Sequence, residues 1–336
     1  MGDNSKVGEY EWTRVADNAA FSGRDGAGAL VFDDRMWLIG GWNPADKKTN
    51  PIHSNCNNEV WSSTDGGTWS RVKPNTHLDD RFDPATDWEA RHTAGYVVYR
   101  DKMWIIGGDP LLGRYQPDVW NSSDAMTWRR VNPDDPVPWG PRVLHHTRVF
   151  QDRIWILGGQ TLPQFAPADE IFYHDLWNTA DGIHWDKVQM TTPFTPGRGM
   201  IGGAAVFNDR IWLLGGGTYA TPLQRHYTYC NDVWSCGDGK AWQRHMEHAP
   251  WRGRVYHSVA VFDDRLWVIA GYGPDGKDMH DVWYSPDGQD WYEVRDTPWP
   301  QRHAASVFVY KDALWIMAGS HMGRDIWKLV RKVETA

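Results

Sequence analysis

The chain has 336 residues, of which 41% are hydrophobic and 23% charged, so it can bury a large core in one domain or two. Its formal net charge of −8 at pH 7 disfavours general attraction to nucleic acid or an anionic membrane, and no apolar run approaches the ~18 residues of a membrane-spanning helix. The 3 cysteines form no even disulfide framework and the first residues lack a secretory-signal pattern, so we expect a cytoplasmic setting without membrane or nucleic-acid partners.

Two short sequence units alternate along the chain. The first reads "DRMWLIGG" at 34–41 and recurs at 101–108, 152–159, 209–216, 264–271 and 312–319. The second, such as "DVWYSPDGQDWYEV" at 281–294, follows each copy of the first except the last. Repeats of about fifty residues are typical of propellers, in which every repeat forms one four-stranded blade.

Each repeat predicts four strands in a fixed order. In the fifth repeat, strand a is "VYHSVAVF" (255–262), strand b ends at the Ala-Gly of 270–271, and strand c (281–285) meets strand d (290–294) through an Asp-Gly turn. Asp-Gly between alternating apolar residues is a strong hairpin signal. The predicted blades cover approximately 24–72, 91–131, 142–188, 198–245, 254–294 and 302–330.

The two ends of the chain complement each other. The last repeat stops at "DIWKLV" (325–330) without a strand d, whereas "YEWTRV" (10–15) has the pattern of that missing strand. An N-terminal strand in this place closes the ring and covers an exposed sheet edge. We therefore predict an all-β fold: one domain over 1–336, a six-bladed propeller with four-stranded blades, closed by the N-terminal strand.

The Gly-Gly or Ala-Gly end of strand b, the tryptophans of strands c and d, and an arginine opening strand a together resemble the kelch repeat. The resemblance covers 10–330 and implies that strands a line a central channel, with the d–a and b–c loops on one face. It does not specify a function, because one fold serves many functions. The build is most similar to the bacterial sialic acid mutarotases and epimerases, which are single-domain kelch proteins.

The arginines share one register. One stands 13 residues before the strand b tryptophan in every repeat but the fourth, where the separation is 14. The kelch arrangement places all of them around one channel mouth, where guanidinium forks suit a carboxylate ligand. The alternative is that they bond loop carbonyls or aspartates within the scaffold. These predicted substrate-binding residues are Arg24, Arg91, Arg142, Arg198, Arg254 and Arg302.

Aromatic residues and loops surround the same mouth. An aromatic residue three places before most of the arginines forms a second ring, either of hydrophobic wedges between blades or of stacking platforms for a ligand. The b–c loops stand over the mouth, so the residues that open them are candidate substrate contacts. The ring is Phe21, Trp88, Trp139, Trp251 and Trp299, and the loop residues are Trp42, Asp109, Gln160 and Tyr272.

The candidate catalytic residues follow the arginines. Asp25, His92 and His303 each stand directly after an arginine, in blades that are contiguous around the closed ring. Two histidines and a carboxylate suit acid–base catalysis near neutral pH or a divalent metal site. The two-residue period of a strand points them away from the arginine face, which favours ordinary hydrogen bonding between blades. His146 on the channel wall and Tyr256 are further candidates.

The resemblance to the mutarotases implies an enzyme that binds a small anionic metabolite, a sugar acid or another carboxylate, at the arginines. It implies isomerisation, mutarotation or related acid–base chemistry that requires no cofactor, with a metal-assisted isomerase or lyase reaction as a variant. Eukaryotic kelch propellers suggest the alternative of a protein or acidic-peptide platform without catalysis. The sequence leaves open the substrate, the reaction type, the metal and the oligomeric state.

Overall fold

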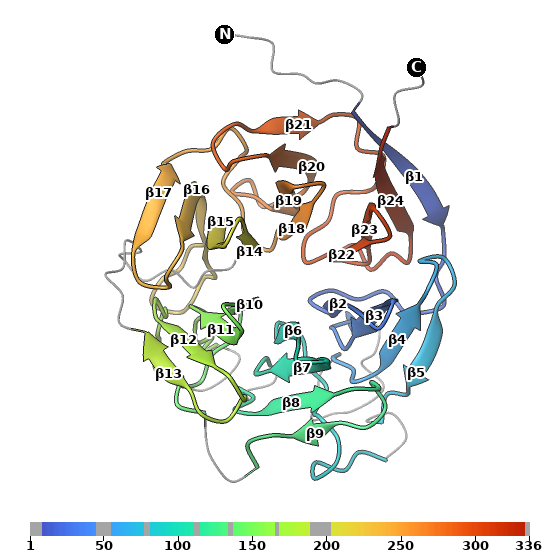
Figure 1. The fold of residues 1–336 in the computed structure, drawn as a ribbon, viewed down its shortest axis with the longest axis vertical. Helices are drawn as coiled ribbons and strands as arrows, with labels where there is room; N and C mark the ends of the chain where they lie inside the picture. Colours follow the sequence, from blue (N-terminus) through green and yellow to red (C-terminus); the bar gives the residue numbers. More distant parts are fainter. Residues whose placement is uncertain are drawn as a thin grey trace.

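The fold is a closed ring of six four-stranded antiparallel sheets around a central channel (Figure 1). The structure is a computed structural model that describes residues 9–44, 55–76, 81–109, 115–133, 137–164, 168–188 and 203–332. The described part of the chain contains no helix long and apolar enough to cross a membrane. The predicted all-β, six-bladed propeller is confirmed.

Each of the first five blades runs outward from the channel in chain order, and the sixth takes its outer strand from the N-terminal end. Blade 1 contains β2 (Gly28–Phe32), β3 (Arg35–Ile39), β4 (Val60–Ser63) and β5 (Ser70–Lys73). Blade 2 contains β6 (Gly95–Tyr99), β7 (Lys102–Ile106), β8 (Val119–Ser122) and β9 (Arg129–Arg130), and blade 3 contains β10 (His146–Phe150), β11 (Arg153–Leu157), β12 (Leu176–Thr179) and β13 (Asp186–Val188). Blade 4 contains β14 (Gly203–Phe207), β15 (Arg210–Thr218), β16 (Thr228–Cys236) and β17 (Trp242–Met246), and blade 5 contains β18 (Ser258–Phe262), β19 (Arg265–Tyr272), β20 (Asp278–Ser285) and β21 (Tyr292–Val294). Blade 6 contains β22 (Ser306–Tyr310), β23 (Ala313–Met317), β24 (Ile326–Arg331) and β1 (Tyr10–Ala16).

The ring closes through β1, which pairs antiparallel with β24 as predicted (Figure 1). Tyr10 is buried, packs edge-on against Trp267 of blade 5 at a centroid distance of 4.9 Å, and donates its hydroxyl proton to Asp263 at 2.6 Å. Glu9 forms ion pairs with Arg265 of blade 5 at 2.8 Å and with Arg331 of β24 at 3.1 Å. The closing strand therefore joins the fifth blade to the sixth as well as completing the sixth sheet.

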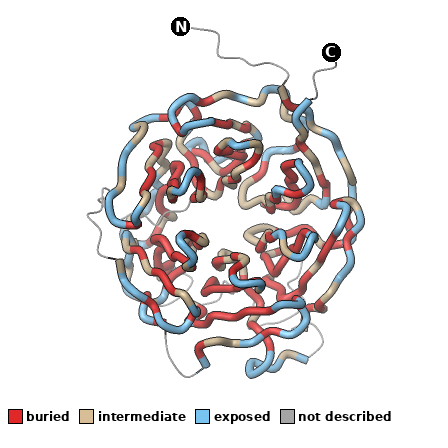
Figure 2. Tube along the Cα trace, in the orientation of Figure 1, coloured by how far each residue is buried: buried red, intermediate tan, exposed pale blue. Residues whose placement is uncertain are grey.

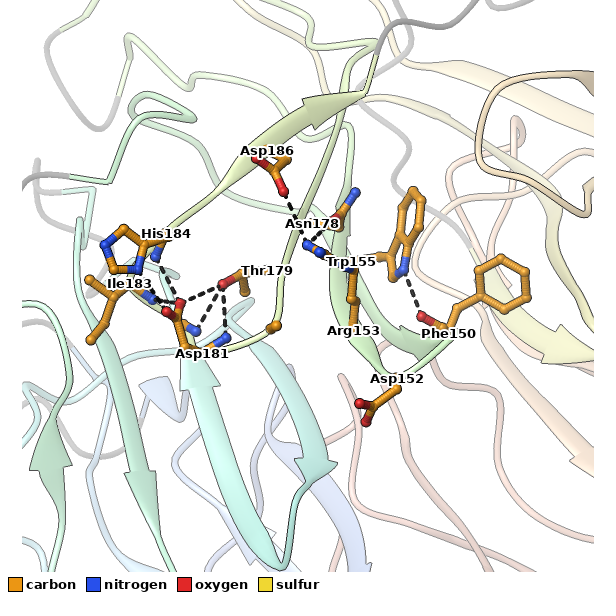
Figure 3. A network of polar contacts seen from close by, with 12 residues as sticks. Phe150, Asp152, Arg153, Trp155, Asn178, Thr179, Asp181, Ile183, His184 and Asp186 are labelled. Carbon is orange, nitrogen blue, oxygen red and sulfur yellow. Dashed lines mark hydrogen bonds and ion pairs between the residues drawn. The ribbon is translucent and has the colours of Figure 1, made fainter.

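Tryptophan and aspartate side chains hold the hairpins of the blades through hydrogen bonds, as blade 3 illustrates (Figure 3). Trp155 Nε1 donates to the carbonyl oxygen of Phe150 at 2.8 Å and so spans the β10–β11 turn. In the β12–β13 turn, Asp181 Oδ1 accepts hydrogen bonds from the backbone N–H groups of Ile183 and His184, both at 2.8 Å. These local bonds satisfy turn amides that would otherwise lack a partner.

The core consists of clusters that lie between adjacent blades, and buried residues predominate on the inner strands while exposed ones predominate on the rim (Figure 2). The ring of aromatic residues before strand a belongs to these clusters, with every member at most 2% exposed. Edge-on aromatic pairs of this kind stabilise a core beyond their buried area. The ring consists of wedges, and each one contacts a strand d tryptophan: Phe21–Trp69 (5.3 Å), Trp88–Trp128 (5.9 Å), Trp139–Trp185 (6.0 Å), Trp251–Trp291 (5.7 Å) and Trp299–Trp12 (5.7 Å).

The arginines do not line the channel mouth, and that prediction is corrected for the five that the structure describes. Each is at most 1% exposed, forms an ion pair with the carboxylate before strand c of its own blade, and donates to the carbonyl oxygen of the residue 16 positions later. A guanidinium buried in the scaffold avoids its desolvation cost only by pairing in this way. Arg198 lies outside the described residues. The pairs are Arg24–Glu59, Arg91–Asp118, Arg142–Asp175, Arg254–Asp281 and Arg302–Asp325.

Deleting residues 1–15 is expected to lower the melting temperature by more than 10 °C, because it removes most of β1 and exposes the edge of β24. Deleting residues 1–8 leaves β1 and Glu9 in place and is the matched control, with little change expected. Circular dichroism melts of the two truncated proteins check the prediction. A deletion of 1–15 that melts within 2 °C of the full chain would show that β1 does not hold the ring closed.

Replacing Arg91 by Met is expected to reduce the free energy of unfolding by about 3–5 kcal/mol, because Asp118 is then buried without its partner. Arg100→Met breaks the solvent-exposed pair with Asp152 and is expected to change stability little. Urea unfolding of both variants measures the difference. Equal stability of the two variants would mean that the buried pair contributes nothing.

Candidate functional site

A cavity of about 440 Å³ lies where the starts of the inner strands meet the b–c loops. Its inner side comes from the residues just after the arginines, and its outer side from the loops of several blades. It therefore occupies the face on which the kelch resemblance places ligand-binding loops. The lining residues are Asp25, Gly26, Trp42, His92, Thr93, Asp109, Leu144, Leu162, Tyr219, Tyr227, Tyr256, Tyr272, His303, Ala304 and Ser320.

Asp25, His92 and His303 face this cavity because each follows an arginine that points into the scaffold, and successive side chains of an extended chain point opposite ways. The residue two places after each described arginine has a positive φ between 49° and 63°, which interrupts the alternation of an extended strand. The expectation that these three side chains point toward a blade interface is wrong, because it took the arginines to face the channel mouth, whereas they point into the scaffold. The left-handed residues are Gly26, Thr93, Leu144, Tyr256 and Ala304.

Backbone hydrogen bonds between these left-handed residues link four consecutive blades. Ala304 N donates to Tyr256 O at 2.8 Å, Gly26 N to Ala304 O at 3.3 Å, and Thr93 N to Gly26 O at 3.2 Å. Because this chain of hydrogen bonds runs from blade 5 through blade 6 and blade 1 to blade 2, it fixes the neighbouring positions of His303, Asp25 and His92. The structure thus brings together four of the five predicted catalytic residues, since Tyr256 lines the same cavity as these three.

His92 is held by a carboxylate. Its Nδ1 lies 2.8 Å from Asp109 Oδ1 and 3.8 Å from the Sγ of the buried Cys56. Burial alone would lower the pKa of His92, but the Asp109 carboxylate raises this pKa well above its ordinary value. The Asp109 carboxylate therefore favours the imidazolium form of His92, in which Nδ1–H is donated to Asp109 and Nε2–H is left for another acceptor.

His303 is held in the same manner by the adjacent blade. Its Nδ1 lies 2.6 Å from Asp278 Oδ1, and the hydroxyl of Ser320 donates to Asp278 Oδ2 at 2.5 Å. Burial would raise the pKa of Asp278, but the hydrogen bonds from His303 and Ser320 lower it, so Asp278 is a carboxylate. Because a carboxylate accepts and does not donate, Nδ1 of His303 carries a proton and its Nε2 is the atom available for proton exchange.

Asp25 belongs to the blade between those of His303 and His92 and lines the same cavity. Its backbone pairs with Trp42, but its carboxyl group accepts no hydrogen bond within the described structure. Burial raises the pKa of Asp25, and the charges of His92 and His303 reduce this rise without cancelling it. A carboxyl group with a raised pKa next to oriented imidazoles is an arrangement suited to proton transfer.

Aromatic side chains form the remainder of the wall. Tyr256 packs against His303 with ring centroids 5.1 Å apart, and Tyr272 contacts His303 edge-on at 5.6 Å. Tyr219 and Tyr227 lie 4.8 Å apart, and hydrogen bonding links the hydroxyl of Tyr227 to those of Tyr219 and Tyr256. Burial raises the pKa of Tyr227 and Tyr256, so these hydroxyls stay protonated and present donors beside apolar ring faces.

The remaining predicted residues are divided between the cavity and other places. Trp42, Asp109 and Tyr272 line the cavity, and the indole Nε1 of Trp42 is buried without a hydrogen-bond partner among the described residues. Gln160 is buried outside the lining, where its Oε1 accepts from Tyr219 N at 2.8 Å and so positions the tyrosine loop. His146 lines the channel wall and is not brought together with the other catalytic candidates.

The described part of the chain contains no cluster of side chains that matches the predicted metal site. No group of three or more His, Cys, Asp or Glu side chains there is arranged to hold a metal ion. The Nδ1 atoms of His92 and His303 are each already occupied by an aspartate.

Sequence reasoning missed Tyr219 and Tyr227 and the roles of Asp278 and Ser320 as partners of His303. The aromatic-rich stretch "GTYATPLQRHYTYCN" (217–231) signals that a loop carries tyrosines, but not which of them turn inward. The pairing of Asp278 with His303 joins β20 to the following blade, and no spacing rule predicts it.

No model of a known protein family matches the chain, and the chain has a distant relative among curated proteins. It is 22% identical over 316 residues to the leucine-zipper-like transcriptional regulator 1 homolog of Drosophila melanogaster. The alignment covers 80% of this chain but 31% of that protein, so the chain spans less than a third of the length of the relative it matches. At this identity, the comparison shows a distant likeness to a regulator.

Proposed function

We propose that the cavity is the active site of an enzyme that carries out acid–base chemistry, isomerisation or mutarotation, on a small sugar or sugar acid. The observation that carries this proposal is the pairing of His92 with Asp109 and of His303 with Asp278, on either side of Asp25 in one cavity. Two oriented imidazoles are more than a scaffold needs, and they supply an acid and a base together. The proposal agrees with the kelch resemblance, which we retain as part of it.

Mutarotation requires that the anomeric hydroxyl lose a proton while the ring oxygen gains one. In our proposal the imidazolium of His92 gives its Nε2 proton to the ring oxygen, and Nε2 of His303 takes the proton of the anomeric hydroxyl. The bond between ring oxygen and anomeric carbon breaks, and the anomeric carbon becomes a carbonyl carbon. Rotation of this group and the reverse transfers close the opposite anomer and restore both imidazoles, so no cofactor is required.

The walls fit a polyhydroxylated ring better than a highly charged ligand. The volume of about 440 Å³ falls in the range of small-molecule sites, and the tyrosine faces suit the C–H face of a sugar. The five described arginines are buried in ion pairs and unavailable to the carboxylate of a sugar acid, which favours a neutral sugar. Asp25 and Asp109 in the wall make a doubly charged anion a poor ligand.

The second candidate function is a non-catalytic platform for a protein or an acidic peptide. It is favoured by the alignment of 80% of this chain with a protein named as a transcriptional regulator homolog.

All 3 cysteines are free thiols, which supports our proposal of a reducing, cytoplasmic setting for either function.

Exchange between anomers, measured by NMR saturation transfer on glucose, galactose, glucuronate and N-acetylneuraminate, tests the enzymatic proposal. At least one sugar is expected to exchange faster with the protein present, and His92→Gln, His303→Gln or Asp25→Asn is expected to reduce this effect by about 100-fold or more. The two histidine substitutions each remove one proton-transfer group, and Asp25→Asn removes the carboxyl group between the two imidazoles; all three preserve volume.

The matched control is His248→Gln, which changes an exposed histidine that does not line the cavity. This variant is expected to keep full activity. Loss of activity in the control to the same degree, or activity that survives all three cavity substitutions, would contradict the assignment. Binding of an acidic peptide that persists in the cavity variants would favour the platform instead.

Asp25→Asn is also expected to stabilise the protein at pH 7. Because folding raises the pKa of Asp25, the native state holds this proton more tightly, and stability is lost as pH rises from the ordinary value of 3.8 through the raised value. Asparagine stays uncharged, so the melting temperature of the variant should exceed that of the wild type at pH 7 and approach it near pH 4. The control is Asp290→Asn, which changes an exposed aspartate and should show no such trend. If Asp25→Asn is instead less stable relative to wild type at pH 7 than at pH 4, the raised pKa of Asp25 is contradicted.

A further inference from the structure

Arg148 is an exception among the inner strands. It is the third residue of β10, and the third residue of every other inner strand is an apolar residue that packs between blades. Those residues are Leu30, Val97, Ala205, Ala260 and Phe308. A cation in this position has to be explained, because it replaces a core contact with a charge.

The side chain of Arg148 reaches across to blade 4 and leaves part of its guanidinium unused. Nε donates to Ala204 O at 2.7 Å and Nη1 to Thr147 O at 2.7 Å, whereas Nη2 has no hydrogen-bond partner within the described residues. The guanidinium lines a channel cavity of about 470 Å³ formed by the inner strands. It therefore has free donors next to open space.

No carboxylate compensates this charge in the described structure. None of the described residues lining the channel cavity is Asp or Glu, and the segment 189–202, which leads into β14, contains neither residue type. By contrast, the five described arginines that open strand a each have an acidic partner. Burial lowers the pKa of Arg148 to about 10, so it remains a cation at neutral pH.

We propose that the central channel binds a compact oxyanion at Arg148, at a site separate from the histidine-lined cavity. The free Nη2 and the neighbouring Nη1 form the fork that pairs with two oxygens on one phosphorus, sulfur or carbon atom. The channel volume accommodates phosphate or a small carboxylate together with water. The bound anion supplies the countercharge that the scaffold lacks and stabilises the contact between blades 3 and 4.

Thermal unfolding in increasing phosphate, at constant ionic strength set with chloride, tests the site. The melting temperature of the wild type should rise by about 2–4 °C more than that of Arg148→Gln, because the anion binds the native state. Phosphate also stabilises proteins by exclusion from their surfaces, so the difference between the two proteins is the quantity that matters. Arg35→Gln, at an exposed arginine, makes the same charge change and should respond like the wild type.

A crystal of the wild type soaked in selenate gives a second measurement that does not depend on the stability of a variant. The proposal expects an anomalous selenium peak within hydrogen-bond distance of Arg148, which formate or phosphate displaces. The absence of a peak in the channel, or equal phosphate responses of wild type and Arg148→Gln, would show that Arg148 is a strut between two carbonyl oxygens and overturn the proposal. Neither result bears on the acid–base cavity.

Discussion

The buried ion pair between an arginine and the carboxylate before strand c is the interaction on which the rest of the structure depends. A guanidinium at most 1% exposed has to satisfy its donors inside the protein, and here it bonds a carboxylate and the carbonyl oxygen at the end of strand b. In most blades the same carboxylate accepts from a strand c tryptophan, as Asp118 does from Trp120 at 2.8 Å. One side chain therefore joins the start of strand a to strands b and c of its blade.

This constraint determines where the next two residues lie. With the arginine fixed, the following residue pairs with the start of the b–c loop, and the residue after that adopts a left-handed conformation. Gly26 adopts it at little cost, but Thr93 and Tyr256 do so against the preference of L-residues. These left-handed residues end the alternation of the strand directly after Asp25, His92 and His303, which line one cavity. In our proposal the scaffold contributes position, and residues that differ between blades contribute the chemistry.

The repeat made the fold predictable, and the same regularity led to the wrong expectation that the arginines form the site. Six copies of one pattern, with the missing strand at the other end of the chain, determine the blades and their closure. The arginines repeat as strictly as the tryptophans because they belong to the scaffold, whereas the site residues differ from blade to blade. Asp25, His92 and His303 were identifiable by that difference, but their direction depends on which way the preceding arginines point, and the sequence left that open. The partners Asp109 and Asp278, and the tyrosines of 217–231, become evident only when adjacent blades are placed side by side.

The claim that this cavity is the functional centre is tested most directly by the protonation state of the histidines, measured by long-range 1H–15N NMR from pH 5 to pH 9. We expect that both ring nitrogens of His92 carry protons at pH 7, that the proton of the neutral His303 ring lies on Nδ1, and that saturating sugar shifts the signals of these two residues. A neutral His92 at pH 7, or a bound sugar that shifts other histidines and leaves these two unchanged, would contradict it.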